Sequence, residues 1–208
     1  MDILTALFGN ETRVKLVRLF IFNPGTPYLL VEMALRTRST PKAVKKELSS
    51  LSKSDLVKKK LIIKDVSLEK GKKTSFKRFK GPGYMLNGNF PYLEPLKNFL
   101  TVASLKADES LAKRFVGTGK IKLLIAAGAF TQNWDSRVDL LIVGDELNLD
   151  KIESVIKIIE SEIGKEIAYS AFNTQDFEYR LGIHDRLIRD ILDYPHITLL
   201  DRLAVEPQ

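Results

Sequence analysis

Residues 29–51, with the sequence LLVEMALRTRSTPKAVKKELSSL, decide the fold of the first half of the chain. The pattern predicts a helix over 29–36 and a short turn over 37–39. Thr40 and Pro41 then predict a helix start, because a hydroxyl caps free N–H groups and proline suits the first helical position. This helix extends to about Leu51. Two helices joined by a tight turn form a helix-turn-helix arrangement.

The second helix of this pair has two chemically different faces. Val44, Leu48 and Leu51 form an apolar stripe, which predicts the side packed on the core. In a helix-turn-helix protein the second helix enters the major groove, with its N-terminal turn nearest the bases. The opposite face and the turn therefore supply candidate contacts to double-stranded DNA, although a solvated helix face is the alternative. These candidates are Arg38, Ser39, Thr40, Lys42, Lys45, Lys46 and Ser49.

The residues on either side extend the pattern. Upstream, Asn10 predicts the cap of a helix that begins at Glu11 and ends before 23–25, apolar on nearly every side and hence buried. Downstream, a short helix is expected to end at Leu56-Val57, followed by a strand at 61–63. A glycine-containing turn at 69–73 then leads to alternating residues at 74–79, and Gly81-Pro82-Gly83 is expected to break this second strand.

These strands predict a β-hairpin with a basic tip. A hairpin in this position contacts the phosphate backbone or the minor groove. The candidate phosphate contacts are Lys70, Lys72, Lys73, Lys77 and Arg78.

The segment LFGNETRVKL at 7–16, Asn23-Pro24 and the helix after Thr40-Pro41 resemble the ArsR-type winged-helix transcriptional regulators of prokaryotes. The resemblance covers about residues 3–90 and implies a DNA-binding regulator. Metal-sensing members of that family use cysteines or histidine clusters. This chain has no cysteine, and its two histidines, His184 and His196, lie outside the segment. No metal and no cofactor are therefore expected.

Charge is distributed unevenly along the chain. Residues 1–100 carry 20 Lys and Arg against 8 Asp and Glu, a net charge of +12, whereas residues 101–208 have a net charge of −5. Residues 36–80 alone hold 16 basic and 4 acidic side chains. Such asymmetry indicates two domains with different partners. Nucleic acid is the partner that the basic half favours; a face that serves solubility is the alternative.

We therefore expect an α+β chain with a winged-helix domain at 1–90, a linker helix at 91–104 and an α/β domain at 105–208. The linker helix packs either against its copy in a homodimer or on its own domain. In the last domain we expect strands at 121–127, 138–143, 167–171 and 196–200, and helices at 107–115, 149–163, 174–181 and 185–192. Gly164 is expected to end the helix at 149–163.

The segment from Gly128-Ala129-Phe130 to Asp139 and the strand after it resembles the minimal nucleotidyltransferases, which share the DNA polymerase β-like fold. That family's motif is Gly-Ser, a spacer, and then Asp-x-Asp at the start of a strand, where paired carboxylates hold Mg²⁺. This chain departs from the motif. Ala129 replaces the serine, Arg137 replaces the first aspartate, and the strand at 167–171 has no acid. The resemblance, over about 105–200, implies the fold without catalysis.

Two interpretations of the surviving aspartate remain open. Asp139 can hydrogen-bond near Arg137 or a helix terminus, as a structural residue. Alternatively, Gly128, Arg137 and Asp139 form a nucleotide pocket without turnover, in which Arg137 contacts a phosphate in place of the metal.

The sequence favours a cytoplasmic, homodimeric DNA-binding transcriptional regulator that is not an enzyme and is not inserted in a membrane. Its second domain has a small-molecule or protein effector as a candidate partner. Two other functions remain open. One is a nucleotidyltransferase or nucleotide-binding protein recruited to nucleic acid by the basic domain, and the other is an antitoxin-like interaction module.

Overall fold

The computed structural model describes residues 3–70, 73–102, 109–133 and 136–205. Helices and strands are mixed along the chain, which confirms the α+β class. The chain divides into two compact units, of which the first comprises residues 1–103 with 160–165 and the second 104–159 with 166–208. Within the described ranges, no helix has both the length and the apolar character needed to cross a membrane.

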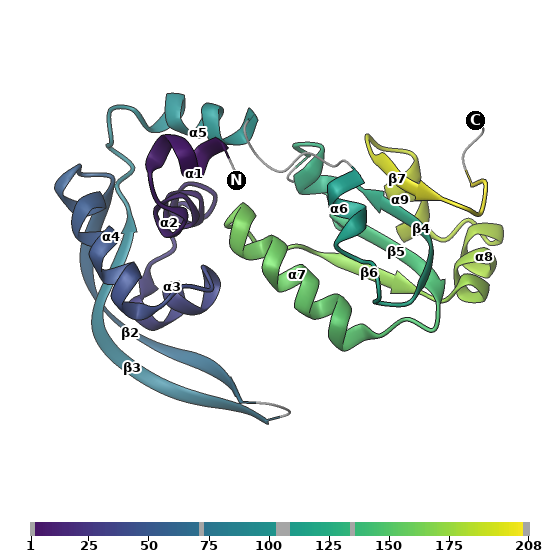
Figure 1. Cartoon of the computed structure of the whole chain (residues 1–208), viewed down its shortest axis with the longest axis horizontal. Coiled ribbons are helices and arrows are strands. Elements are labelled where there is room, and N and C mark those ends of the chain that lie inside the picture. Colours follow the sequence, from purple (N-terminus) through teal and green to yellow (C-terminus); the bar gives the residue numbers. More distant parts are fainter. Residues whose placement is uncertain (1–2, 71–72, 103–108, 134–135, 206–208) are drawn as a thin grey trace. The chain divides into compact units, whose positions relative to one another are not determined.

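The first unit combines five helices and a three-stranded antiparallel sheet, counted over the described residues. The sheet has the order β1-β3-β2. Figure 1 shows the long β2–β3 hairpin curving alongside the helices. The elements are α1 (Ile3–Phe8), α2 (Glu11–Ile21), β1 (Tyr28–Leu29), α3 (Leu30–Arg36), α4 (Pro41–Lys53), β2 (Val57–Lys70), β3 (Lys73–Leu86) and α5 (Leu93–Val102).

The core of this unit forms around α2, as its apolar sequence predicts. The Asn10 side chain caps α2 by accepting from the Arg13 N–H at 3.2 Å. Phe20 is fully buried and meets the Tyr28 ring edge-on, with centroids 6.2 Å apart. Leu100 of α5 is also fully buried in this core. The helix expected as a linker therefore packs on its own unit through at least one of its faces.

The hairpin is longer and more regular than the sequence predicts. Each strand has 14 residues, β2 begins at Val57 with no short helix before it, and β3 runs unbroken through Gly81-Pro82-Gly83. The predicted break was therefore wrong. The reason is that β1 pairs only with Tyr84 and Gly83 of β3. Pro82 therefore has β2 on one side and no strand on the other. A missing N–H is tolerated at such an edge.

Gly83 is required for close packing within the hairpin. A Cβ built at this residue would lie 2.5 Å from Cδ1 and 2.7 Å from Cγ1 of Ile62. The Ile62 side chain therefore occupies the space that a side chain at position 83 would need. Gly81, two residues earlier, has open space at the equivalent position.

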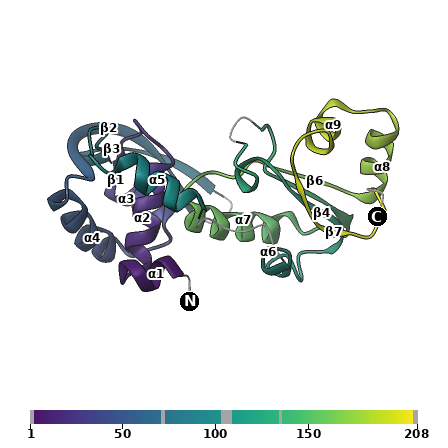
Figure 2. The same ribbon diagram turned by 90° about the horizontal axis from the view of Figure 1, so that it is seen from above.

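The second unit has a four-stranded mixed sheet with the order β6-β5-β4-β7. β5 and β6 are parallel, and β4 is antiparallel to both β5 and β7. Figure 2 shows α8 and α9 on one face of this sheet and α6 and α7 on the other. The elements are α6 (Glu109–Lys113), β4 (Lys120–Ala126), η1 (Gly128–Phe130), β5 (Leu140–Asp145), α7 (Leu149–Ile163), β6 (Tyr169–Phe172), α8 (Thr174–Gly182), α9 (Arg186–Leu192) and β7 (Ile197–Asp201). The last residues of α7, from 160 on, are counted with the first unit.

Strand alternation explains the core of the second unit. Leu123, Ile125, Leu141 and Val143 point to one face, where they pack with Phe177 of α8 and with Ile188 and Ile191 of α9. α7 has the predicted bounds, and Gly164 follows it with a φ of +81°. β5 begins at Leu140, two residues later than predicted, and β6 begins at Tyr169. Part of the predicted 107–115 helix lies outside the described residues.

Replacing Gly83 by alanine should lower the free energy of unfolding by about 1–3 kcal/mol, because Ile62 must leave its present rotamer. The matched control is Gly81→Ala, which meets open space and should change stability by less than about 1 kcal/mol. Chemical denaturation of the full chain measures both. Equal effects of the two substitutions would contradict the packing assigned to Gly83.

Candidate functional site

Helix α4 presents a basic face because its cap and its apolar stripe fix its position. The Thr40 side chain accepts from the Ala43 N–H at 3.3 Å, as predicted, and Pro41 occupies the first turn. Val44, Leu48 and Leu51 are buried, which confirms the predicted core side. The opposite side is exposed and carries Lys42, Lys45, Lys46 and Ser49.

An ion pair that the sequence analysis missed joins α4 to α2. Arg13 Nε donates to Glu47 Oε2 at 2.7 Å, and the Glu47 side chain is 3% exposed against 35% for Arg13. Arg13 Nη1 also donates to the Phe8 carbonyl at 3.3 Å. Glu47 lies on the inner side of α4, between the lysines and the core. The pair therefore fixes the rotation of α4 about its axis and, with it, the direction of the lysine face.

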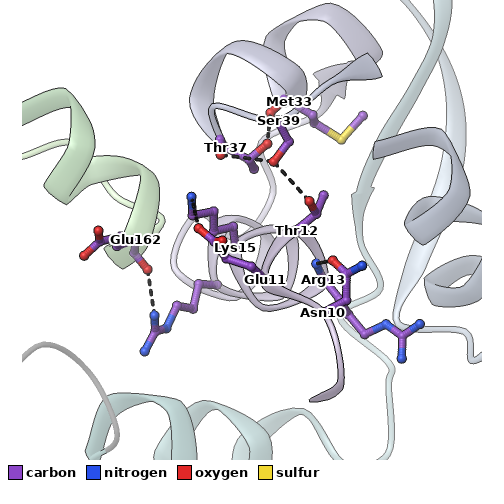
Figure 3. A network of polar contacts seen from close by, with 10 residues as sticks. Asn10, Glu11, Thr12, Arg13, Lys15, Met33, Thr37, Ser39 and Glu162 are labelled. Carbon is purple, nitrogen blue, oxygen red and sulfur yellow. Dashed lines mark hydrogen bonds and ion pairs between the residues drawn. The ribbon is translucent and has the colours of Figure 1, made fainter. Parts of the chain in front are cut away.

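The turn between α3 and α4 is held by hydroxyl groups (Figure 3). The buried Thr37 Oγ1 donates to the Met33 carbonyl at 2.7 Å. Ser39 Oγ donates to the Thr37 carbonyl and lies 3.2 Å from Thr12 Oγ1 of α2. Ser39 is a half-buried member of this network, so its hydroxyl has partners inside the protein. Arg38, between them, is exposed and has a φ of +51°.

The hairpin adds basic residues to the same unit. Arg78 and Lys80 of β3 are exposed. Lys70 lies opposite Lys73 and Lys77 lies opposite Val66 in the strand register, and Lys72 lies outside the described residues. The base of β2 presents three further exposed lysines, at 58–60, which the sequence analysis did not select. The run of three consecutive lysines was a signal that could have found them.

Gly128 and Asp139, for which the sequence leaves a structural role and a nucleotide pocket open, lie next to each other in the second unit. Asp139 is 5% exposed. Its Oδ1 accepts from the Ala129 N–H at 2.7 Å and its Oδ2 from the Ala168 N–H at 2.9 Å. Gly128 has a φ of +51°, and a Cβ there would collide with Asp139 Oδ1. The arrangement is that of a structural carboxylate that ties η1 to the residue before β6.

Arg137 points elsewhere. Its side chain is 60% exposed, lies 3.7 Å from Asp190 of α9 and lines a cavity of about 330 Å³. Gly128 and Asp139 are not among the residues that line this cavity. The three residues of the nucleotide-pocket interpretation are therefore divided. Gly128 lies beside the buried Asp139, whose carboxylate bonds to the N–H groups of Ala129 and Ala168, whereas Arg137 lines an open pocket. Among the described residues, no group of three His, Cys, Asp or Glu side chains is placed to bind a metal ion.

No protein-family model matches the chain, and neither the curated proteins nor the solved structures contain a match.

The Arg13–Glu47 pair yields a stability test. Arg13→Gln should lower the free energy of unfolding by about 2–4 kcal/mol, because it leaves the Glu47 carboxylate buried without its cation. The control is Arg189→Gln, which breaks a pair with Asp193 that is exposed on both sides and should cost under about 1 kcal/mol. Denaturant unfolding distinguishes them, and similar losses would contradict the role of the buried pair.

A second test concerns Asp139. Asp139→Asn should lower stability by about 1–3 kcal/mol, because an amide offers one acceptor oxygen where two backbone N–H groups donate to the buried carboxylate. Asp193→Asn breaks an exposed pair with Arg189 and should cost less than about 1 kcal/mol. If unfolding measurements found no difference between these variants, Asp139 would not have the structural role described.

Proposed function

We propose that the chain is a prokaryotic DNA-binding transcriptional regulator and that its first unit is a winged helix. The observation that carries the proposal is the exposed lysine face of α4, fixed by the Arg13–Glu47 pair and followed at once by a basic hairpin. In this proposal α4 is the recognition helix. Lys42, Lys45 and Lys46 are its contacts to phosphates or base edges in the major groove.

The turn supports α4 in two ways. Arg38 is exposed just before the N-terminus of α4. In this proposal its guanidinium group contacts the DNA backbone. The Ser39 hydroxyl bonds within the protein, so we assign it a positioning role in addition to any DNA contact. Ser49, in the third turn of α4, is exposed and extends the same face.

The hairpin is the proposed wing. A strand of 14 residues is roughly 45 Å long at about 3.3 Å per residue, which exceeds one turn of B-DNA at about 34 Å. The wing is therefore long enough to follow the phosphate backbone beyond the groove that α4 would occupy. Arg78, Lys80 and the lysines at 58–60 are exposed along it.

We propose that the regulator acts as a homodimer. Regulators with a helix-turn-helix commonly bind symmetric operators as dimers. The first unit exposes large apolar side chains that a second copy could cover, namely Ile3 and Leu7 of α1, each 67% exposed, and Phe99 of α5. Ile3 and Leu7 are four residues apart and so lie on the same side of α1.

For the second unit we propose a nucleotidyltransferase-like fold that does not catalyse nucleotide transfer and that receives a small-molecule or protein effector. The hydrogen bonds of Asp139 support this assignment. Both carboxylate oxygens accept from backbone N–H groups. A magnesium ion would have to compete with these bonds for the one aspartate of the motif that the chain retains.

The proposal is tested by binding purified protein to genomic DNA fragments at two salt concentrations and sequencing the bound fraction. We expect enrichment of a palindromic site. Replacing both Lys45 and Lys46 by glutamine should reduce the slope of log affinity against log salt by about 1.8, if each contacts one phosphate. A lost base contact should weaken the enriched site by a further factor of about 10 relative to random DNA.

Two further variants complete this test. Lys72→Gln with Lys73→Gln should weaken binding to all sequences alike, while Lys97→Gln, an exposed change on α5, should leave affinity within about twofold of the original. Absence of DNA binding at low salt would contradict the proposed function. A Lys45/Lys46 variant indistinguishable from the Lys97 variant would contradict the assignment of α4.

A further inference from the structure

A pocket in the second unit has the chemistry of a small-molecule site. The cavity of about 330 Å³ lies between the segment that precedes β5 and helix α9. This volume is at the lower end of the range of small-ligand pockets, about 300–1,000 Å³. The polar side chains that line it are Asn133, Ser136, Arg137, Arg186, Asp190 and Tyr194.

Two arginines from different parts of the chain line this pocket. Arg137 comes from the segment before β5, and its pair with Asp190 is long, at 3.7 Å, with 60% of the arginine side chain exposed. Arg186 comes from the first turn of α9, and its side chain forms no hydrogen bond or ion pair with any residue in the described part of the chain. Guanidinium groups bind carboxylate and phosphate oxygens through paired N–H donors. The pocket therefore offers donors that an oxyanion would satisfy.

The remaining side chains restrict the ligand further. Asp190, 33% exposed, repels a simple anion but accepts a hydrogen bond from a hydroxyl or amino group. The three ionised groups sum to a charge of +1, so one anionic group remains favourable. Tyr194 is 60% exposed at the rim, where its ring can cover the ligand. Leu187 and Ile191 supply the apolar lining from α9.

We infer that this pocket binds a small organic molecule that carries an oxyanion group, phosphate or carboxylate, together with a hydroxyl or amino group. Arg137 and Arg186 bind the oxyanion, and Asp190 accepts from the hydroxyl or amino group. Arg186, Asp190 and Tyr194 lie outside the Gly128–Asp139 segment, so the site differs from the one that the nucleotidyltransferase-like motif would form. The inference does not depend on DNA binding by the first unit.

Isothermal titration of the full chain tests the site with two polyhydroxy probes, ribose 5-phosphate and gluconate, which carry the two oxyanion groups. The basic first unit also attracts anions. We therefore compare two variants that each remove one arginine of α9 and leave the first unit unchanged. Arg186→Gln should weaken binding of the preferred probe at least tenfold, or about 1.4 kcal/mol. Arg189→Gln removes an exposed arginine paired with Asp193, outside the pocket, and should change affinity less than twofold.

Inorganic phosphate tests the role of Asp190. Asp190→Asn should weaken binding of the polyhydroxy probe several-fold and strengthen binding of inorganic phosphate, because a neutral amide is a weaker acceptor than a carboxylate and does not repel an anion. Tighter binding of ribose 5-phosphate would identify the ligand class as a phosphate ester, and tighter binding of gluconate would identify it as a hydroxy acid. The inference is overturned if both probes bind more weakly than about 10 mM, or if Arg186→Gln and Arg189→Gln behave alike.

Discussion

The Glu47 carboxylate lies on the inner side of α4, where water is excluded, and the Arg13 guanidinium of α2 compensates its charge. A buried charge is costly unless it is paired, so α4 cannot turn about its axis without losing this compensation. Lys42, Lys45 and Lys46 have their directions fixed as a consequence. The core holds α2 in place, and the Arg13–Glu47 pair holds α4 against α2. The orientation of the lysine face that we propose for DNA therefore depends on this pair.

The second unit uses a buried carboxylate in a different way. Asp139 is compensated by the N–H groups of Ala129 and Ala168, which carry no net charge but supply two directed bonds. Gly128 is needed because any side chain there would occupy the place of Asp139 Oδ1. Local backbone geometry thus explains Asp139 and Gly128, which resemble part of a catalytic motif. Arg137 takes no part in these bonds and lines the pocket beside α9.

The sequence predicts the local features of both units well. The caps at Asn10 and Thr40, the buried side of α4 and the bounds of α7 follow from residues close in sequence. What it missed depends on distant partners. The strand through Pro82 needs the end of β1, and the Glu47 pair joins residues 34 positions apart. The pocket needs α9 to lie beside Arg137, which no periodicity in either segment indicates.

The two proposed binding surfaces differ in how they attract anions. Residues 1–100 carry a net charge of +12, and exposed lysines act over a Debye length of about 10 Å in moderate salt, so their attraction is long-ranged and sensitive to salt. Residues 101–208 have a net charge of −5, which opposes anions at a distance. Arg137 and Arg186 must therefore act through short, directed hydrogen bonds. Such a site selects a small ligand by shape, whereas the lysine face of α4 suits a polyanion.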